Sequence, residues 1–139
     1  MGPLGAVEFA VPFVVGKGRV RFVRQTGRTY TPTRTQDAMA VVQAAFAATG
    51  AQMAPAGLPV RVAIKTLRHL PKSRPKRVES EPDVYKPDAD NVAKLVLDAL
   101  NGLAWEDDTQ VVALDVVKLP RMRDARDMTQ VSIEWLEER

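Results

Sequence analysis

The sequence predicts an α+β fold, a mixed β-sheet with two main helices packed on one face. Val60–Leu67 and Met128–Leu136 alternate apolar and polar residues, as half-buried strands do. Asp90–Gly102 instead repeats its apolar residues at helical spacing. The chain has 139 residues, enough to bury a core but too few for two full-sized domains. We therefore expect one domain over residues 1–139.

The amino-terminal region predicts short strands that carry basic residues. Val7–Val15 is largely apolar, and Pro12 within it places this strand at a sheet edge or a bulge. A Gly-Lys-Gly turn follows, then a strand over Arg19–Val23 in which arginines alternate with apolar residues. A second turn leads into a return strand over Thr29–Thr31. We expect these strands to form a meander with arginines along it.

A first helix and a long loop are predicted from caps, prolines and charge. Residues 33–49 favour a helix that Thr33 or Thr35 caps and that Gly50 ends. Residues 68–86 hold several prolines and a dense run of charge. We expect a mobile basic loop there, because an internal connection of this length is usually functional.

The second predicted helix, Asp90–Gly102, is amphipathic, and its expected N-cap is Asp90 or Asn91. The expected buried stripe consists of Val92, Leu95, Val96, Ala99 and Leu103. A strand over Val111–Leu119, a loop over Pro120–Arg126 and the final strand complete the chain. The predicted order is β-β-β-α-β-α-β-β.

Composition excludes several classes of protein and site. The chain has no cysteine, which excludes disulfide scaffolds, thiolate zinc sites and cysteine nucleophiles. His69 is its one histidine, so no site takes two histidines from one chain. The start lacks a basic region, and no apolar run approaches roughly 18 residues, the length of a membrane span. We expect a cytoplasmic protein that has no membrane partner.

Charge is distributed unevenly along the chain. Residues 17–34 hold six basic side chains and no acid, and residues 61–77 hold seven basic side chains and no acid. Residues 83–115 reverse the balance, with eight acids against two lysines. Two basic segments around an acidic centre indicate a polyanion held over a metal-binding carboxylate cluster. Solvated loops and solvated faces are the alternative interpretation.

The acidic centre has the residue types of a site for a hard cation. Asp88 and Asp90 lie at the expected helix start, with Lys94 one turn further on. Asp107 and Asp108 precede the next strand, and we expect them to return to that helix start. Carboxylates without histidine or cysteine suit Mg²⁺, which activates water for phosphoryl transfer. Each acid alone also fits a cap or a turn, but together they would repel one another without a cation.

These acids belong to a longer motif with fixed gaps. The motif is Lys86-Pro-Asp88-x-Asp90-Asn91-x-x-Lys94-x-x-x-Asp98-Ala-Leu-Asn-Gly102, followed by Asp107-Asp108-x-Gln110-Val111 and by Lys118 at the strand end. With Gly16–Arg21, Tyr30–Pro32 and Pro71–Ser73, it resembles the RusA family of Holliday-junction resolvases, in the phage and prophage branch. The resemblance touches most of the chain.

The resemblance implies a homodimeric, Mg²⁺-dependent endonuclease that cuts four-way DNA junctions by symmetric paired nicks, with Mn²⁺ as a substitute cation. Carried over by position, Asp88, Asp90 and Asp108 would be the metal-binding catalytic carboxylates. Lys94 would be the catalytic lysine. Three motif residues would support them, namely Asn91, Asp98 and Asp107. The protein would be encoded by a bacterium or a phage.

Contacts to junction DNA are expected from the basic strand and the basic loop. The residues are Lys17, Arg19, Arg21, Arg24, Lys72, Arg74, Lys76, Arg77 and Lys86. Few aromatic residues are available to stack on bases, so junction shape is the expected signal. Symmetric cutting needs two sites at a fixed separation, which a two-fold dimer supplies. The dimer surface is expected to be the apolar face of the second helix or an exposed strand edge.

Two other functions stay open at this point. A catalytically inactive module would bind junction DNA without metal-dependent nicking. Another metal-dependent nuclease or phosphotransferase would act on RNA or on nucleotides. Competition between junction, linear duplex and single-stranded RNA separates these alternatives.

Overall fold

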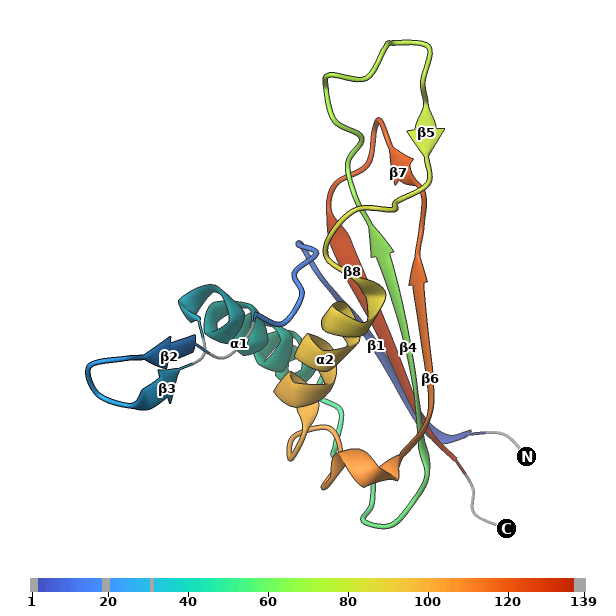
Figure 1. Cartoon of the computed structure of the whole chain (residues 1–139). Helices are drawn as coiled ribbons and strands as arrows, with labels where there is room; N and C mark the ends of the chain where they lie inside the picture. Colours follow the sequence, from blue (N-terminus) through green and yellow to red (C-terminus); the bar gives the residue numbers. More distant parts are fainter. Residues whose placement is uncertain (1–2, 19–20, 31, 137–139) are drawn as a thin grey trace.

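The computed structural model has two layers, a four-stranded sheet with two helices on one face (Figure 1). It describes residues 3–18, 21–30 and 32–136. The elements are β1 (Pro3–Val11), β2 (Arg21–Val23), β3 (Arg28–Tyr30), α1 (Thr33–Ala48), β4 (Val60–Leu67), β5 (Ser80–Glu81), α2 (Ala89–Leu100), the 3-10 turn η1 (Asp108–Gln110), β6 (Val111–Lys118), β7 (Arg121–Met122) and β8 (Met128–Leu136). The predicted α+β class is confirmed.

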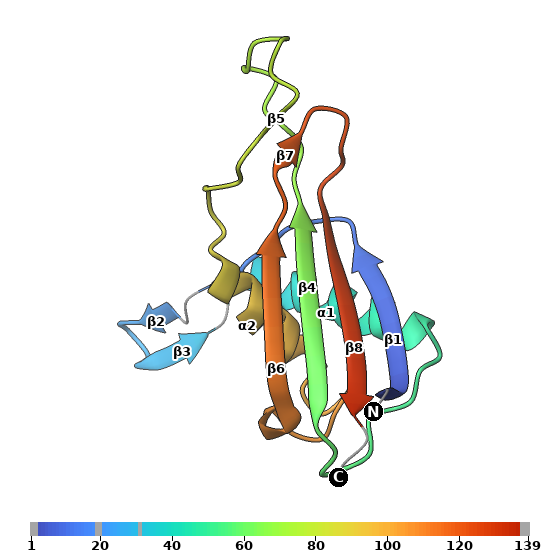
Figure 2. The same cartoon turned by 90° about the vertical axis from the view of Figure 1, so that its right-hand side faces the viewer.

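The main sheet has the strand order β1-β8-β4-β6 and is mixed, as predicted. β4 pairs with β6 in parallel and with β8 antiparallel, and β1 pairs with β8 antiparallel. Figure 2 shows this sheet face-on with both helices behind it. β4 and β8 have the predicted bounds, whereas β1 ends at Val11, because Pro12 has no N–H for a strand ladder.

The core lies between the sheet and the helices. The buried face of β4 consists of Val60, Val62, Ile64 and Thr66, which confirms the predicted alternation. α2 buries Val92, Ala93, Leu95, Val96, Ala99 and Leu100. Each fully buried valine, leucine or isoleucine contributes about 1.5–3 kcal/mol. Because the apolar face of α2 packs inside the molecule, this face is not a dimer surface, and Leu103 lies beyond the end of the helix.

Both helix caps differ from the prediction, although α1 starts at Thr33 as predicted. The N-cap of α1 is Pro32 and that of α2 is Asp88, and neither side chain caps its helix. Thr35 is buried, and its Oγ1 accepts a hydrogen bond from the N–H of Gly18 at 2.9 Å. A tertiary contact therefore takes the hydroxyl that local sequence assigned to a cap. The predicted stop at Gly50 is confirmed by its φ of 74°.

Two smaller pieces project from the two-layered body. β2 and β3 form a separate hairpin ahead of α1, not a meander with β1 (Figure 1). Residues 68–86, which we call the arm, extend past the end of β4 and pair through β5 with β7. The sequence did not predict β5 or β7, because strands of two residues show no periodicity. The mobility of the arm stays a prediction. No helix in the described part of the chain is long and apolar enough to span a membrane.

Candidate active site

The start of α2 carries the first two predicted carboxylates. Asp88 is the N-cap, and Asp90 lies in the first turn. Asp90 and Lys94 approach to 3.9 Å, and their side chains are 71% and 63% exposed. An exposed pair of this kind contributes at most about 1 kcal/mol. Both side chains can therefore rearrange around a ligand at little cost.

Lys17 joins segment 13–18 to α2. Its ammonium group forms an ion pair with Asp98, and its N–H donates to the carbonyl oxygen of Asn91 at 2.9 Å. Gly16 permits this approach, because a Cβ there would lie 3.0 Å from the Cβ of Asn91. Lys17, a predicted DNA contact, and Asp98, a predicted supporting residue, thus bind each other and hold segment 13–18 on α2.

Asp107 and Asp108 lie at the opposite end of α2. Asp107 caps η1, and its carboxylate accepts a hydrogen bond from the N–H of Thr109 at 3.0 Å. Asp108 accepts from the indole N–H of Trp105 at 2.7 Å, and its own N–H donates to the Asn101 side chain at 3.1 Å. The expected return to the helix start is wrong, because buried Trp105 and the helix end hold this turn in place.

The structure does not bring the three predicted carboxylates together within one chain. α2 has 12 residues, so its two ends lie about 18 Å apart. Within residues 3–18, 21–30 and 32–136, no three acidic or histidine side chains gather closely enough to hold a metal ion. The donors suit a hard cation in type. One chain supplies two of them at one end of α2 and one at the other.

A cleft of about 810 Å³ opens at the start of α2. Its walls are formed by residues 14–18, by the start of α1 and by the entry to α2. The charged side chains that line it are Lys17, Arg34, Arg68, Lys86 and Asp88. Among the lining residues that the structure describes, none has an aromatic side chain. The cleft is therefore basic, with a predicted catalytic carboxylate in its wall.

Comparison with protein families matches residues 12–134 to endodeoxyribonuclease RusA. This match covers nearly the whole chain, including every carboxylate described above. The chain belongs to the RusA family. It is also similar to the uncharacterized protein YqaN of Bacillus subtilis (strain 168), with 43% identity over 68 residues. That second match covers 43% of this chain and 48% of YqaN, so it spans about half the length of the relative.

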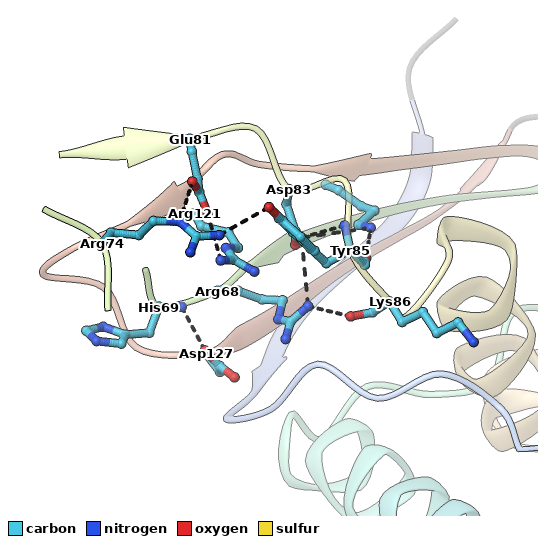
Figure 3. A network of polar contacts seen from close by, with 10 residues as sticks. Arg68, His69, Arg74, Glu81, Asp83, Tyr85, Lys86, Arg121 and Asp127 are labelled. Carbon is cyan, nitrogen blue, oxygen red and sulfur yellow. Dashed lines mark hydrogen bonds and ion pairs between the residues drawn. The ribbon is translucent and has the colours of Figure 1, made fainter. Parts of the chain in front are cut away.

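In this RusA-family chain, Glu81 links the arm to β7 (Figure 3). Its carboxylate accepts hydrogen bonds from Arg74 at 2.9 Å and from Arg121 at 2.7 Å. The hydrogen bond from Arg74, with the charge of Arg121, holds the pKa of Glu81 below its ordinary value of 4.5. Arg74 also donates to the hydroxyl of Tyr85, and the Arg121 guanidinium lies 4.2 Å from the centre of that ring. Arg74, predicted to bind DNA, is therefore engaged inside the arm.

Asp83 is the buried acid at the base of the arm. Its side chain is 0% exposed, 3.7 Å from Arg68 and 4.0 Å from Lys118. These two cations also donate to the carbonyl oxygens of Lys86 and Tyr85, both at 2.5 Å. The cluster joins the ends of β4 and β6 to the chain that enters α2. Sequence reasoning missed its role, because contacts between distant residues leave no local pattern.

The predicted DNA-binding residues differ in their exposure and in whether they line the cleft. Four exposed residues do not line the cleft, namely Arg24, Lys72, Lys76 and Arg77. Lys86 lines the cleft, whereas Arg19 and the side chain of Arg21 lie outside the described residues. Sequence reasoning missed Arg34 and gave Arg68 only as the start of the basic loop, whereas both line the cleft. Both belong to basic runs, but folding alone reveals that they lie beside α2.

Proposed function

We propose that this protein is an endodeoxyribonuclease that resolves four-way DNA junctions by symmetric paired nicks in the cytoplasm, using Mg²⁺ or Mn²⁺. The observation that carries the proposal is the exposed carboxylate of Asp88 in the wall of a basic cleft. Phosphodiester hydrolysis needs cationic groups that bind phosphate and acids that bind a hard cation. Membership of the RusA family supports the reaction class.

In this proposal, Asp88 and Asp90 hold the cation from the start of α2. When bound, Mg²⁺ supplies positive charge and a more acidic water for attack on the phosphodiester. Lys94, exposed beside Asp90, stabilises the negative charge that develops on the phosphate. The indole of Trp105 donates to one carboxylate oxygen of Asp108 and so orients this group. In this proposal, Asp108 serves the site of a second copy of the chain.

The position of Asp108 favours a site shared between two copies of the chain. α2 and β6 run in opposite directions. The start of β6 follows η1 at the end of α2, and Lys118 at the end of β6 donates to the carbonyl of Tyr85, just before the entry of α2. A two-fold axis across the middle of β6 would bring Asp108 of one copy to Asp88 of the other. The homodimer in this proposal therefore completes each carboxylate set.

The test uses a mobile-core four-way junction labelled on one strand at a time, with linear duplex as control substrate. The protein should make paired symmetric nicks in Mg²⁺ and none in EDTA. Asp88→Asn should bind the junction but cut it about 100-fold more slowly or worse, since loss of even an outer partner of a metal site has effects up to that size. Asp37→Asn changes an exposed acid of α1 outside the cleft, so it should cut like the parent.

Three outcomes would redirect the proposal. Cutting by Asp88→Asn at the parental rate would show that the site is elsewhere. Junction binding without nicks in Mg²⁺ or Mn²⁺ would favour a catalytically inactive binding module. Faster cutting of single-stranded RNA than of the junction would favour a different metal-dependent nuclease.

A further inference from the structure

The cationic side chains of the cleft at the start of α2 differ in how far the protein itself engages them. Lys17 is paired with Asp98, and Arg68 donates to the carbonyl of Lys86. Arg34 and the ammonium group of Lys86 have no hydrogen bond or ion pair within the described chain. Figure 3 shows the Lys86 side chain pointing away from the polar network of the arm. Within the described part of the chain, these two cations are thus available to a ligand.

We propose that this cleft binds the sugar–phosphate backbone of one DNA strand beside the bond that is cut. Arg34 is the new phosphate-binding residue in this proposal, and Arg68 and Lys86, both in the basic loop already expected to contact DNA, complete the set. The inference rests on the proposed nuclease function and adds to it the part of the substrate that this surface recognises.

The lining of the cleft favours backbone over bases. Base recognition in single strands uses aromatic side chains for stacking, and none of the described residues that line the cleft is aromatic. Small-molecule pockets are mostly apolar and often aromatic, whereas four of the lining side chains here are cationic. The volume of about 810 Å³ falls in the range of about 300–1,000 Å³ that small ligands occupy. It therefore suits a short stretch of one strand better than a whole duplex.

Arg34 lines the cleft, and the backbone around it is held in place by contacts between segment 14–18 and α1. Gly18 packs closely against the start of α1. A Cβ on this residue would lie 2.8 Å from the hydroxyl oxygen of Thr35, so no larger residue fits there without a shift. The N–H of Gly18 donates to that same oxygen, which fixes segment 14–18 against α1. Arg34, the residue before Thr35, is exposed at this junction. The start of a helix also carries partial positive charge, which adds to the attraction for phosphate.

The first experiment measures junction binding in EDTA, where no cutting interferes. Arg34→Ala should weaken binding of a labelled four-way junction about tenfold, the usual size for a lost hydrogen bond to a charged group. It should also lower the slope of log affinity against log salt by about one unit, as expected for one lost phosphate contact. Arg61→Ala is the control, because Arg61 is exposed on β4 and does not line the cleft.

The second experiment locates the contact on the DNA. Neutral methylphosphonates replace single phosphates next to the nick position, one at a time. At one of these positions the substitution should weaken binding to the parent protein but not to Arg34→Ala, because the same contact is then already lost. Arg68→Ala should give the same pattern at a neighbouring phosphate, and its thermal unfolding is measured alongside because Arg68 also contacts Asp83.

The inference is overturned if Arg34→Ala changes affinity and salt slope no more than Arg61→Ala does. It is also overturned if every methylphosphonate weakens both proteins equally. Failure of the nuclease function gives a different result, namely junction binding by the parent without nicks in Mg²⁺. If the parent cuts normally and Arg34→Ala binds the junction with the affinity and salt slope of the parent, the cleft inference alone is rejected.

Discussion

Glu81 is the ionisable residue that links the arm to β7. Two arginines from different parts of the chain converge on its carboxylate, Arg74 within the arm and Arg121 on β7. Because these partners stabilise the charged form, the pKa of Glu81 is lowered below 4.5 in the folded protein. A lowered pKa means that Glu81 stabilises the arm at higher pH and loses this effect as pH falls through the folded pKa.

We predict that the arm opens in acid through protonation of Glu81. Amide hydrogen exchange at Arg123, whose N–H donates to the carbonyl of Glu79 beside β5, reports this opening. Below about pH 4.5, exchange in the parent should rise toward that of Glu81→Gln, which should be fast throughout. Glu79→Gln, which leaves the carboxylate of Glu81 in place, should follow the parent. Equal exchange in the parent and Glu81→Gln near neutral pH would refute the role of this carboxylate.

Segment 13–18 is the element that fixes the wall of the cleft. It contains no regular structure, yet its backbone touches α2 directly. A Cβ on Gly16 would lie 2.8 Å from the Cβ of Pro87 and 3.0 Å from that of Asn91. Neither atom can move without moving the entry of α2, where Asp88 lies. The position of the start of α2 therefore depends on a glycine far away in sequence.

We predict that Gly16→Ala displaces this segment and lowers stability by about 1–3 kcal/mol, the usual effect of overpacking. Cutting should fall more than the loss of folded protein explains, because the displacement occurs beside Asp88. Thermal unfolding and single-turnover nicking measure the two effects. Gly57→Asn is the control, since no atom lies within 4 Å of a Cβ there and asparagine tolerates positive φ. A Gly16→Ala protein with parental stability and rate would show that the contact is not needed.

At the scale of the whole molecule, the two sheet edges differ in character. β1 presents exposed Glu8 and stops before Pro12. β6 instead exposes Val112, Leu114 and Val117, at 62%, 45% and 37%. An apolar edge with unpaired backbone groups favours pairing with another strand. We propose that β6 of a second copy pairs here antiparallel, which brings Asp108 of each copy toward Asp88 of the other.

Mixed dimers test this arrangement. Asp88→Asn and Asp108→Asn should each be inactive alone, but their mixture should regain nicking, because one of the two shared sites then keeps all its carboxylates. The nicks should be single, since the other site of the same dimer carries both changes. A mixture of Asp88→Asn with Asp90→Asn is the control and should stay inactive, because each site then lacks one carboxylate. Equal inactivity of both mixtures would reject a shared site.

Much of the fold could be predicted from local pattern. The alternation of β4 and β8 and the amphipathic stripe of α2 depend on neighbours in the sequence, so periodicity finds them. Caps were predicted less well, because Thr35 bonds to Gly18 in place of its own helix. The motif predicted which residues belong to the candidate site, but it did not predict where the fold places them. Asp107 and Asp108 were expected at the start of α2 and lie at its end.

The sequence alone fixed the class of the fold, the basic and acidic regions, and the carboxylates that suit a hard cation. These properties depend on composition and on spacing over one or two turns. Folding decided which charges meet, namely Lys17 with Asp98, and Arg68 with Asp83. It also placed Asp88 and Asp108 at opposite ends of α2, because the rigid length of a helix separates residues that a motif lists together. Distances between distant residues are set by packing, and no local pattern encodes them.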